Sequence, residues 1–277
     1  MKGLLAGLQL HTVCQSAHCP NHAECWGQRT ATFMVLGRVC TRCCTFCAVN
    51  GGHPEAVDPE EPEKVAEAVK RLGLRHAVIT SVTRDDLPDG GSAHIARTVT
   101  AVRMRNPGTT VEVVVQDFKG DPQAIARVVE AEPDIFGHNI ETVARLHPVL
   151  RDWRFRYTRS LETLRLAASH ANETCVKSAF LLGCGENDAE IRQTLEDLLD
   201  AGCIAVCMGQ YLQPTARHHA VARFVTPAEF AAYEELAYAL GFAFAVAGPL
   251  VRSSYRSGEL LQHIAPRKTG GNASHAI

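Results

Sequence analysis

The chain has 277 residues, of which 46% are hydrophobic, and its formal net charge is −2 at pH 7. This charge argues against the basic field of nucleic-acid-binding proteins, and no apolar run is long enough for a membrane-spanning helix. The first residues, MKGLLAGLQL, lack a long apolar core and a small-residue cleavage site, so we expect no signal peptide. Eleven cysteines without an export signal then indicate metal ligation in a reducing compartment, and we expect a cytoplasmic protein.

Seven of the eleven cysteines lie between residues 14 and 47, in two triplets with unequal spacing. Three thiolates can hold a four-iron cluster and leave one iron open, whereas structural zinc usually takes a closed set of four ligands. We therefore favour two 4Fe-4S clusters over structural zinc or plain buried thiols. The first triplet is Cys14, Cys19 and Cys25, and the second is Cys40, Cys44 and Cys47.

Two further residues in this stretch are alternative ligands. Cys43 fits neither spacing, and we predict a bystander, with a one-residue shift in ligation as the alternative. His22 lies within the first triplet and is the histidine that could replace one of its thiols.

Apolar segments that read as strands alternate with amphipathic helices along the rest of the chain. Val65, Val69 and Leu72 recur at helical spacing, and Thr226 and Pro227 are typical of a helix start. This alternation predicts an α/β fold with a parallel sheet buried on both faces, and about seven strands favour a partly closed barrel. The expected strands are 31–37, 76–82, 111–115, 134–139, 175–182, 204–212 and 242–248, and the expected helices are 59–73, 121–132, 160–170, 188–202 and 226–241.

The second triplet follows the first strand of this barrel directly. In α/β barrels the chemistry gathers at the carboxyl ends of the strands, so this loop is a suitable place for a reactive cluster. A dinucleotide-binding sheet is disfavoured, because no GxGxxG motif follows a strand. The last ten residues, KTGGNASHAI, are polar and are predicted to be frayed.

The motif CTRCCTFC at 40–47 resembles the radical S-adenosylmethionine (radical SAM) superfamily. A wider resemblance, to the lipoyl synthase family, spans nearly the whole chain. The four-and-five spacing of the first triplet together with a C-terminal RSSY is specific to that family. The matching segments are 14–50, TSVTRDDLPDGG at 80–91, HNIETV at 138–143, MGQYLQPT at 208–215 and RSSY at 252–255.

The sequence departs from this family's pattern at a few positions and leaves every expected cluster ligand in place. Ala179 and Cys184 replace a glycine and an apolar residue, Gln116 stands where a proline is common, and Gln15 replaces an acidic residue.

The resemblance implies a partial (β/α)6-type TIM barrel of the radical SAM type over 31–248, an N-terminal cluster-binding extension over 1–30, and a C-terminal capping segment over 249–277. It implies that Cys40, Cys44 and Cys47 hold a 4Fe-4S cluster whose open iron binds S-adenosylmethionine (SAM).

The resemblance also implies that Cys14, Cys19 and Cys25, with Ser253, hold an auxiliary 4Fe-4S cluster, with Ser254 as the alternative ligand. An alkoxide is a harder ligand than a thiolate, which suits an iron that must be released. The alternative interpretation of RSSY is a turn whose hydroxyls bond to backbone.

The implied reaction is the radical insertion of two sulfur atoms, at C6 and C8, into a protein-bound octanoyl-lysine. The auxiliary cluster is the sacrificial sulfur source, and two SAM molecules yield 5′-deoxyadenosine and methionine beside each lipoyl-lysine. Two other classes stay open. One is a radical enzyme with a different acceptor, in which the auxiliary cluster only transfers electrons. The other is a zinc-binding interaction module without enzymatic activity.

The resemblance also implies the partners. They are an octanoylated lipoyl carrier domain (the E2 subunit of a 2-oxoacid dehydrogenase or the H protein of glycine cleavage), a ferredoxin- or flavodoxin-type electron donor, and an iron–sulfur carrier for cluster repair. We expect no nucleic-acid partner and no membrane, and a monomer.

Four polar residues at strand ends are candidate cofactor-binding residues. Asn139 and Glu141 follow a strand and could bind the ribose or amino group of SAM, or else be a helix cap and a solvated acid. Lys177 and Gln210 are similar candidates, and a lysine at a strand edge is otherwise ordinary.

The remaining polar and sulfur-containing residues have simpler interpretations. Arg84, Asp85 and Asp86 are interpreted as a surface charge cluster, or as the lining of a substrate entrance. The other cysteines are predicted to be buried small residues and the His pair to lie in a loop: Cys175, Cys184, Cys203, Cys207, His218 and His219.

Overall fold

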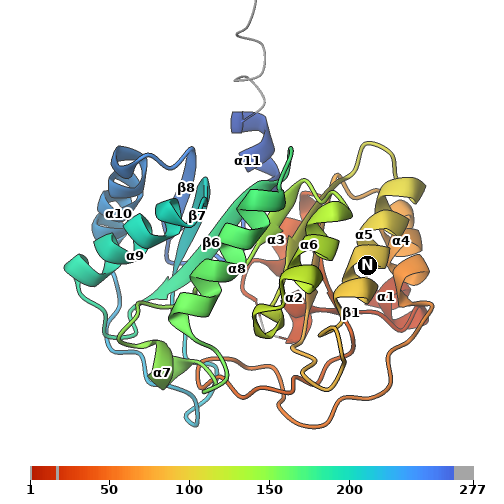
Figure 1. The fold of residues 1–277 in the computed structure, drawn as a ribbon, viewed down its shortest axis with the longest axis horizontal. Helices are drawn as coiled ribbons and strands as arrows, with labels where there is room; N and C mark the ends of the chain where they lie inside the picture. Colours follow the sequence, from red (N-terminus) through yellow and green to blue (C-terminus); the bar gives the residue numbers. More distant parts are fainter. Residues whose placement is uncertain (1, 17–18, 265–277) are drawn as a thin grey trace, which may run out of the picture.

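An eight-stranded sheet runs through the part of the chain that the computed structural model describes, residues 2–16 and 19–264 (Figure 1). The spatial order of the strands follows the chain, so that β1 and β8 are the two edges and the barrel is open. β1 is antiparallel to β2, and all later pairs are parallel. The strands are β1 (His11–Thr12), β2 (Thr30–Val35), β3 (His76–Ser81), β4 (Thr110–Val114), β5 (Ile135–Gly137), β6 (Cys175–Leu182), β7 (Ala205–Gln210) and β8 (Phe244–Gly248).

Each parallel strand from β2 to β7 is followed by a helix, and β8 closes the series. This is six β/α units and one further strand, so the predicted α/β partial barrel is confirmed. The covering helices are α4 (Glu61–Leu72), α5 (Ser92–Arg105), α6 (Pro122–Glu130), α8 (Tyr157–His170), α9 (Asp188–Asp200) and α10 (Pro227–Leu240). Shorter helices are α1 (Lys2–Gly7), α2 (Val13–Ser16), α3 (His22–Gly27), η1 (Phe118–Gly120), α7 (His147–Leu150) and α11 (Ser257–Ile264). Within the described residues, no helix is long and apolar enough to span a bilayer.

The seven predicted strands correspond to β2 through β8, and the five predicted helices are all present. Helix α10 begins with a complete capping box between Thr226 and Glu229, as its sequence indicates. In the sheet and the helices that cover it, the edge strand β1 and helix α5 were not predicted, and the shorter helices α1, α2, α3, η1, α7 and α11 were not predicted either. Helix α5 buries Ser92, His94 and Thr98 beside its apolar residues, so its sequence gives a weak amphipathic pattern, and its N-cap residue is Gly91, which has no side chain to mark the start.

Side chains alternate between the two faces of the sheet, as the pleat requires. The outer face carries Phe33, Ile79, Val113 and Phe136 into the main core beneath the helices. The inner face carries Thr80, Val114 and Ala179 toward the barrel lumen. A close approach on the inner face explains Gly209, because a Cβ there would overlap the carbonyl oxygen of Val251.

After β8 the chain turns back and runs along this inner face. Val251 packs against Ala179 and Cys207, in the middle of β6 and β7. Leu260 of α11 then packs against the first residues of four strands, Ile135, Cys175, Ala205 and Phe244. The segment therefore passes from the carboxyl ends of the strands to their amino ends, where α11 lies (Figure 1).

The division into an extension (1–30), a barrel (31–248) and a capping segment (249–277) stays a prediction. The predicted frayed tail at 268–277 lies outside the described residues.

Candidate functional site

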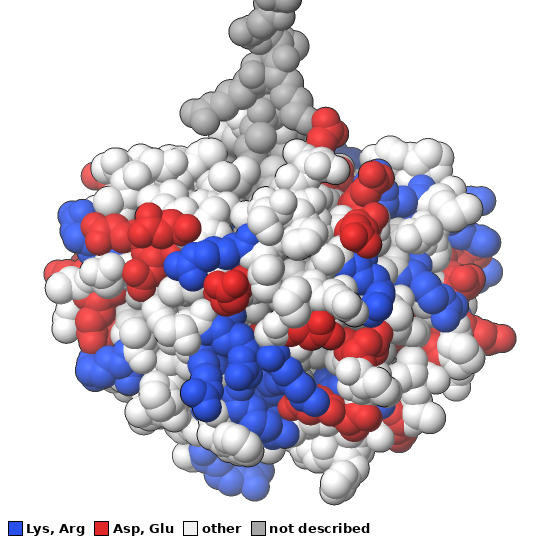
Figure 2. Space-filling model, viewed as in Figure 1, with Lys and Arg blue, Asp and Glu red and all other residues white. Residues whose placement is uncertain are grey.

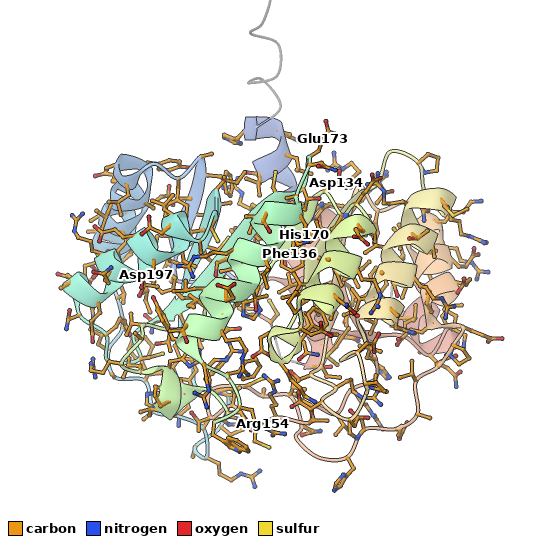
Figure 3. The ribbon with its side chains drawn as sticks, in the orientation of Figure 1. Asp134, Phe136, Arg154, His170, Glu173 and Asp197 are labelled. Atoms are coloured by element: carbon orange, nitrogen blue, oxygen red, sulfur yellow. The ribbon has the colours of Figure 1, made fainter. Side chains whose placement is uncertain are left out.

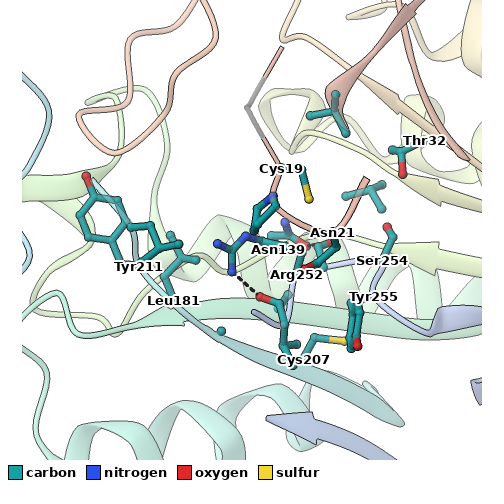
Figure 4. Close-up of a pocket in the computed structure, with 18 of the residues that line it drawn as sticks. Cys19, Asn21, Thr32, Asn139, Leu181, Cys207, Tyr211, Arg252, Ser254 and Tyr255 are labelled. Atoms are coloured by element: carbon teal, nitrogen blue, oxygen red, sulfur yellow. Dashed lines mark hydrogen bonds between the residues drawn. The ribbon is translucent and has the colours of Figure 1, made fainter. Parts of the chain in front are cut away.

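A cavity of about 530 Å³ occupies the barrel lumen, and the predicted site residues converge on it. All three cysteines of the first triplet line it, together with Cys47 of the second triplet. Asn139, Glu141, Gln210, Ser253 and Ser254 also line it. Figure 4 shows the side chains of Cys19, Asn139, Arg252 and Ser254 gathered in this cavity. Residues separated by more than 200 positions in the chain thus share one site.

The first triplet lies on the two short helices that precede β2 and on the segment between them. Cys14 lies on α2, Cys25 lies on α3, and Cys19 lies between them. Burial raises the pKa of the Cys14 thiol, and burial together with the neighbouring Cys14 and Cys19 raises the pKa of Cys25 to about 11. The three thiols are therefore close enough to influence each other, and none of them forms a disulfide. A bound metal would favour their thiolate forms.

The C-terminal segment meets this triplet directly. Asn21 donates from Nδ2 to the carbonyl of Leu250 at 2.5 Å, and the Tyr255 hydroxyl donates to Glu24 Oε1 at 3.2 Å. The Arg252 guanidinium is partly buried, which lowers its pKa, and it interacts electrostatically with Cys19. The RSSY segment thus lies beside the first triplet, although the two are far apart in sequence.

The two serines of RSSY have different partners. Ser253 Oγ donates to Asn139 Oδ1 at 3.0 Å, and Ser254 Oγ donates to Glu112 Oε1 at 3.1 Å. Both hydroxyls bond to side chains, so neither makes the backbone-bonded turn that was the alternative interpretation.

The second triplet lies on the loop after β2. The backbone N–H of Arg42 donates to Cys40 Sγ and that of Asp152 donates to Cys44 Sγ, each at 3.4 Å. Burial raises the pKa of the Cys47 thiol to about 12, with further increases from Cys44 and Glu141. N–H donors to cysteine sulfur are a recognised feature of iron–sulfur sites.

Among the described residues, no three Cys, His, Asp or Glu side chains stand close enough to hold one metal ion. The thiols of each triplet interact electrostatically with one another.

Of the two alternative ligands, only Cys43 has a described side chain. Cys43 is exposed and does not line the cavity, and its N–H donates to Asp152 Oδ2 at 2.9 Å. The side chain of His22 is outside the described residues.

A buried ionic network holds the second-triplet loop. The Arg42 guanidinium bonds to both oxygens of Asp85 and to Asp117 Oδ1, each at 2.8 Å, and stacks 4.0 Å from the Phe155 ring centroid. Arg84 is only 2% exposed and donates to the Leu36 carbonyl at 2.9 Å. The interpretation as surface charges is therefore wrong for Arg84 and Asp85, which hold loops together from inside. It holds for Asp86, which is exposed and pairs with Arg84.

Asn139 and Glu141 lie where the chain leaves β5. The backbone of Glu141 bonds to the Ala179 and Leu181 backbones, so this segment continues the sheet beside β6. Glu141 has a φ of 68°, a strained conformation for a non-glycine residue. Burial raises its pKa, while Arg151 and the Asn139 amide lower it. Strain and an unusual pKa at a cavity wall are typical of functional residues.

Lys177 does not line the cavity. Its ammonium bonds to Glu112 Oε1 at 2.5 Å and to the Ser253 carbonyl at 2.8 Å. This is a different position from the SAM contact that the sequence suggested.

Gln210 lines the cavity, but all its polar atoms hold the following loop. Its Nε2 donates to the carbonyls of Tyr211 and Arg223, and its Oε1 accepts the Val225 N–H.

The sequence analysis missed the interior charges of the barrel. Glu112 interrupts the apolar run VEVVV, and Lys177 interrupts CVKSAFLL. Each of these two buried strands carries one charged residue that faces inward. Such a pattern indicates an ion pair, because a charged side chain is rarely buried without a partner of opposite charge.

Six residues predicted to lie outside the chemistry are where expected. Cys175, Cys184, Cys203 and Cys207 are buried, and Cys207 also lines the cavity. His218 and His219 lie in a loop, where their rings contact the carbonyls of Cys47 and Cys184 at 3.1 and 3.3 Å.

The chain matches the family model of the radical SAM superfamily over residues 34–198. Curated relatives match far more of it. The lipoyl synthase of Rubrobacter xylanophilus is 53% identical over 259 residues, which cover 94% of this chain and 80% of that protein. The lipoyl synthase of Caldanaerobacter subterraneus subsp. tengcongensis is 51% identical, covering 93% and 90%. The lipoyl synthase of Thermus thermophilus is 49% identical, covering 93% and 80%.

Solved structures share the fold at low sequence identity. Methylornithine synthase superposes with a TM-score of 0.55 at 15% identity, over 80% of this chain and 67% of that one. The FeFe-hydrogenase maturase HydG from Carboxydothermus hydrogenoformans superposes with a TM-score of 0.56 at 12% identity, over 85% and 66%. These two likenesses bear on the fold alone.

Proposed function

Because this chain belongs to the lipoyl synthase family, within the radical SAM superfamily, we propose that it inserts two sulfur atoms into a protein-bound octanoyl chain. The acceptor carbons are C6 and C8 of an octanoyl group attached to a lysine. The observation that carries the proposal is the shared cavity, in which the first triplet, Cys47 and both serines of RSSY meet.

The superfamily uses a 4Fe-4S cluster and SAM, and Cys40, Cys44 and Cys47 are the residues that would hold this cluster. When bound, the cluster supplies the electron that cleaves SAM and so provides a radical able to remove hydrogen from an alkyl carbon. The fit is supported by three free thiols and by N–H donors to Cys40 Sγ and Cys44 Sγ. The protein's own contribution is to position the reactants and to keep water out.

We assign the auxiliary 4Fe-4S cluster, the sulfur source, to Cys14, Cys19, Cys25 and Ser253. These residues line the same cavity as Cys47, which brings the source of sulfur close to the carbon that loses hydrogen. Ser253 is preferred to Ser254 because its hydroxyl bonds to a neutral amide, whereas Ser254 bonds to the buried carboxylate of Glu112. A bond to a charged acceptor is stronger, so Ser253 is more easily released to a metal.

Asn139 and Glu141 are the proposed SAM-binding residues. An acidic group at the cavity wall can accept hydrogen bonds from the SAM amino group or ribose hydroxyls, and the Asn139 amide can both donate and accept hydrogen bonds. Phe46, Leu181 and Leu212 line the same cavity and limit the access of water. Lys177 and Gln210 act indirectly, by holding the RSSY segment and the loop after β7.

The substrate is a lipoyl carrier protein, as the family name implies. We propose the E2 subunit of a 2-oxoacid dehydrogenase or the glycine cleavage H protein as the carrier. We also propose a ferredoxin- or flavodoxin-type electron donor, an iron–sulfur carrier that rebuilds the spent cluster, a monomeric state and a cytoplasmic location.

The test begins with iron and sulfide analysis after anaerobic purification. We expect close to two 4Fe-4S clusters per chain, and zinc without sulfide would refute the radical chemistry. Incubation with SAM, dithionite and an octanoyl-lysyl peptide should then give 5′-deoxyadenosine and a peptide that has gained two sulfur atoms. Formation of 5′-deoxyadenosine without sulfur gain would refute lipoyl synthesis and favour a radical enzyme with another acceptor.

Two serine variants test the assigned ligand. Ser253→Ala should bind SAM normally but lose sulfur transfer, and its first-triplet cluster should lose iron more readily. Ser254→Ala is the matched control and should retain sulfur transfer. The reverse pattern would move the assignment to Ser254, and full activity in both variants would refute a serine ligand.

A further inference from the structure

A basic face covers the outer side of the second-triplet loop. It surrounds a hollow of about 250 Å³ lined by Arg42, Asp85, Lys119, Trp153, Arg154, Arg156 and Arg159. We define the basic face as Lys119, Arg154, Arg156 and Arg159 around Trp153. Figure 2 shows Lys and Arg side chains gathered at the bottom of the molecule, where Figure 3 labels Arg154. Asp134 and Glu173, which precede β5 and β6, lie at the opposite end in Figure 3, so the face belongs to the carboxyl ends of the strands.

The basic face keeps a surplus of positive charge after the ion pairs between its cations and the neighbouring carboxylates are counted. Arg42 pairs with Asp85 and Asp117, Arg154 with Asp152 at 2.8 Å, and Arg159 with Asp117 at 3.6 Å. Lys119 donates to the backbone carbonyl of Asp85 at 2.9 Å, and its charge interacts with the carboxylates of Asp85 and Asp86, which are already paired with Arg42 and Arg84. Five cations (Arg42, Lys119, Arg154, Arg156, Arg159) therefore stand against three carboxylates (Asp85, Asp117, Asp152).

The face is connected to the second triplet by short hydrogen bonds. Arg154 Nη2 donates to the Thr41 carbonyl at 2.7 Å. Asp152 accepts the Cys43 N–H at 2.9 Å, and the Asp152 N–H donates to Cys44 Sγ at 3.4 Å. One hydrogen bond thus separates the backbone beside Trp153 from a proposed cluster ligand. In the described part of the chain, no residue of the basic face lines the 530 Å³ cavity, so the face and the cavity lie on different sides of this loop.

We propose that the basic face is the docking surface for an acidic one-electron carrier protein. The inference rests on the proposed function, in which each SAM cleavage consumes one electron from outside. In the transfer, the carrier is oxidised by one electron and the 4Fe-4S cluster at the second triplet is reduced by one electron. The cavity is needed for SAM and the octanoyl chain, which leaves the outer side of the loop for the donor. A cationic patch steers an acidic partner, and Trp153, 82% exposed, is suited to anchor it.

The test uses the full-length enzyme with both clusters reconstituted. The charge-reversal variant Lys119→Glu/Arg156→Glu changes two exposed side chains of the face. Its matched control is Lys70→Glu/Arg103→Glu, which reverses two exposed cations on the last turns of α4 and α5. Each protein is assayed with dithionite and with a reduced flavodoxin chosen for a strongly negative net charge. Binding of that flavodoxin is also measured directly by titration calorimetry.

With flavodoxin, the basic-face variant should show a Kd and a KM for the donor raised about tenfold or more, and a weaker dependence on salt. The control variant should match the wild type. With dithionite, which needs no docking, all three proteins should form 5′-deoxyadenosine at equal rates. Trp153→Ala should also weaken flavodoxin binding, without changing its salt dependence.

Two outcomes would overturn the proposal. One is unchanged flavodoxin binding in the basic-face variant. The other is a dithionite-driven rate that falls with a raised KM for the octanoylated carrier, which would make the face a substrate-docking surface instead. Failure of the wild type itself to form 5′-deoxyadenosine with dithionite would instead refute the proposed function, so the two failures are distinguishable.

Discussion

Lys177 on β6 and Glu112 on β4 form an ion pair inside the barrel, with 2.5 Å between Nζ and Oε1, and both residues hold the RSSY segment. Lys177 donates to the Ser253 carbonyl, and Glu112 accepts the Ser254 hydroxyl. The two side chains are 1% and 0% exposed. Because Lys177 and Glu112 lie on the sheet and bond to two consecutive serines, this ion pair fixes the position at which the C-terminal segment contacts the first triplet.

Removing one partner of this pair should destabilise the protein strongly. In Lys177→Met the Glu112 carboxylate stays buried without its ammonium partner and keeps only the contacts with Ser254 and His76, and such losses typically cost about 3–5 kcal/mol. We expect the free energy of unfolding of the cluster-free protein, measured in urea, to fall by about that amount.

The double variant Lys177→Met/Glu112→Leu is the control for this effect. It removes both charges, so most of the lost stability should return. A single Lys177→Met variant as stable as the wild type would show that the pair contributes nothing to the fold.

The same carboxylate should make stability depend on acid pH. Burial alone would raise the pKa of Glu112, but the Lys177 ammonium and His76 lower it to about 2, from an ordinary value near 4.5. A folded-state pKa below the unfolded one stabilises the protein above about pH 4.5, and this contribution is lost as pH falls toward 2. We expect the free energy of unfolding to decrease more steeply over this window in the wild type than in Glu112→Gln. Parallel curves would contradict the assigned pKa.

Much of the architecture could be predicted because its signals are local. The apolar strands, the cap at Thr226 and the cysteine spacing each depend on a few adjacent residues. Helix α5 escaped detection because buried polar residues such as His94 and Thr98 interrupt its apolar stripe, and His94 is balanced by Glu61 from α4 at 2.7 Å. A partner from another helix cannot be read from the segment itself.

In the candidate site, too, some residues could be predicted from local signals and others could not. The cysteine spacing alone indicates the cluster ligands, and RSSY became a candidate only through the family resemblance. The roles of Lys177, Gln210 and Arg84 depend on which distant groups they contact. Lys177 bonds to a residue 65 positions away, and Arg84 bonds to a carbonyl 48 positions away. Non-local pairs of this kind decide whether a polar residue faces the cavity or braces a loop.

Gly209→Ala should displace the RSSY segment without removing any proposed ligand. The added Cβ would overlap the Val251 carbonyl oxygen, and backbone cannot rotate away as a flexible side chain can. Overpacking of this kind costs about 1–3 kcal/mol. We expect the first-triplet cluster to be lost while the second is retained, so that iron and sulfide per chain fall by about half.

Gly7→Ala is the matched control for this variant, because nothing lies within 4 Å of a Cβ at Gly7. It should keep a full complement of iron and sulfide. Full iron content in Gly209→Ala would mean that the C-terminal segment does not need its present position to support the auxiliary cluster.

Arg42→Lys should loosen the second-triplet loop although it keeps the positive charge. The guanidinium reaches Asp85 through two nitrogens and Asp117 through a third, and a single ammonium cannot reproduce this geometry. We expect a loss of about 1–3 kcal/mol in unfolding free energy, since one buried carboxylate loses a hydrogen bond.

The rate at which the second-triplet cluster loses iron measures how far the loop has loosened. In proteins whose first-triplet cysteines are all replaced by Ala, only the second cluster remains, and iron release to a chelator can be followed at that site alone. Release should be faster in Arg42→Lys than in the parent and unchanged in the control Arg97→Lys, where Arg97 is 55% exposed and 3.9 Å from Glu63. Equal release rates in all three proteins would contradict the role of Arg42, because a loop held by other contacts would not respond to the shape of this one side chain.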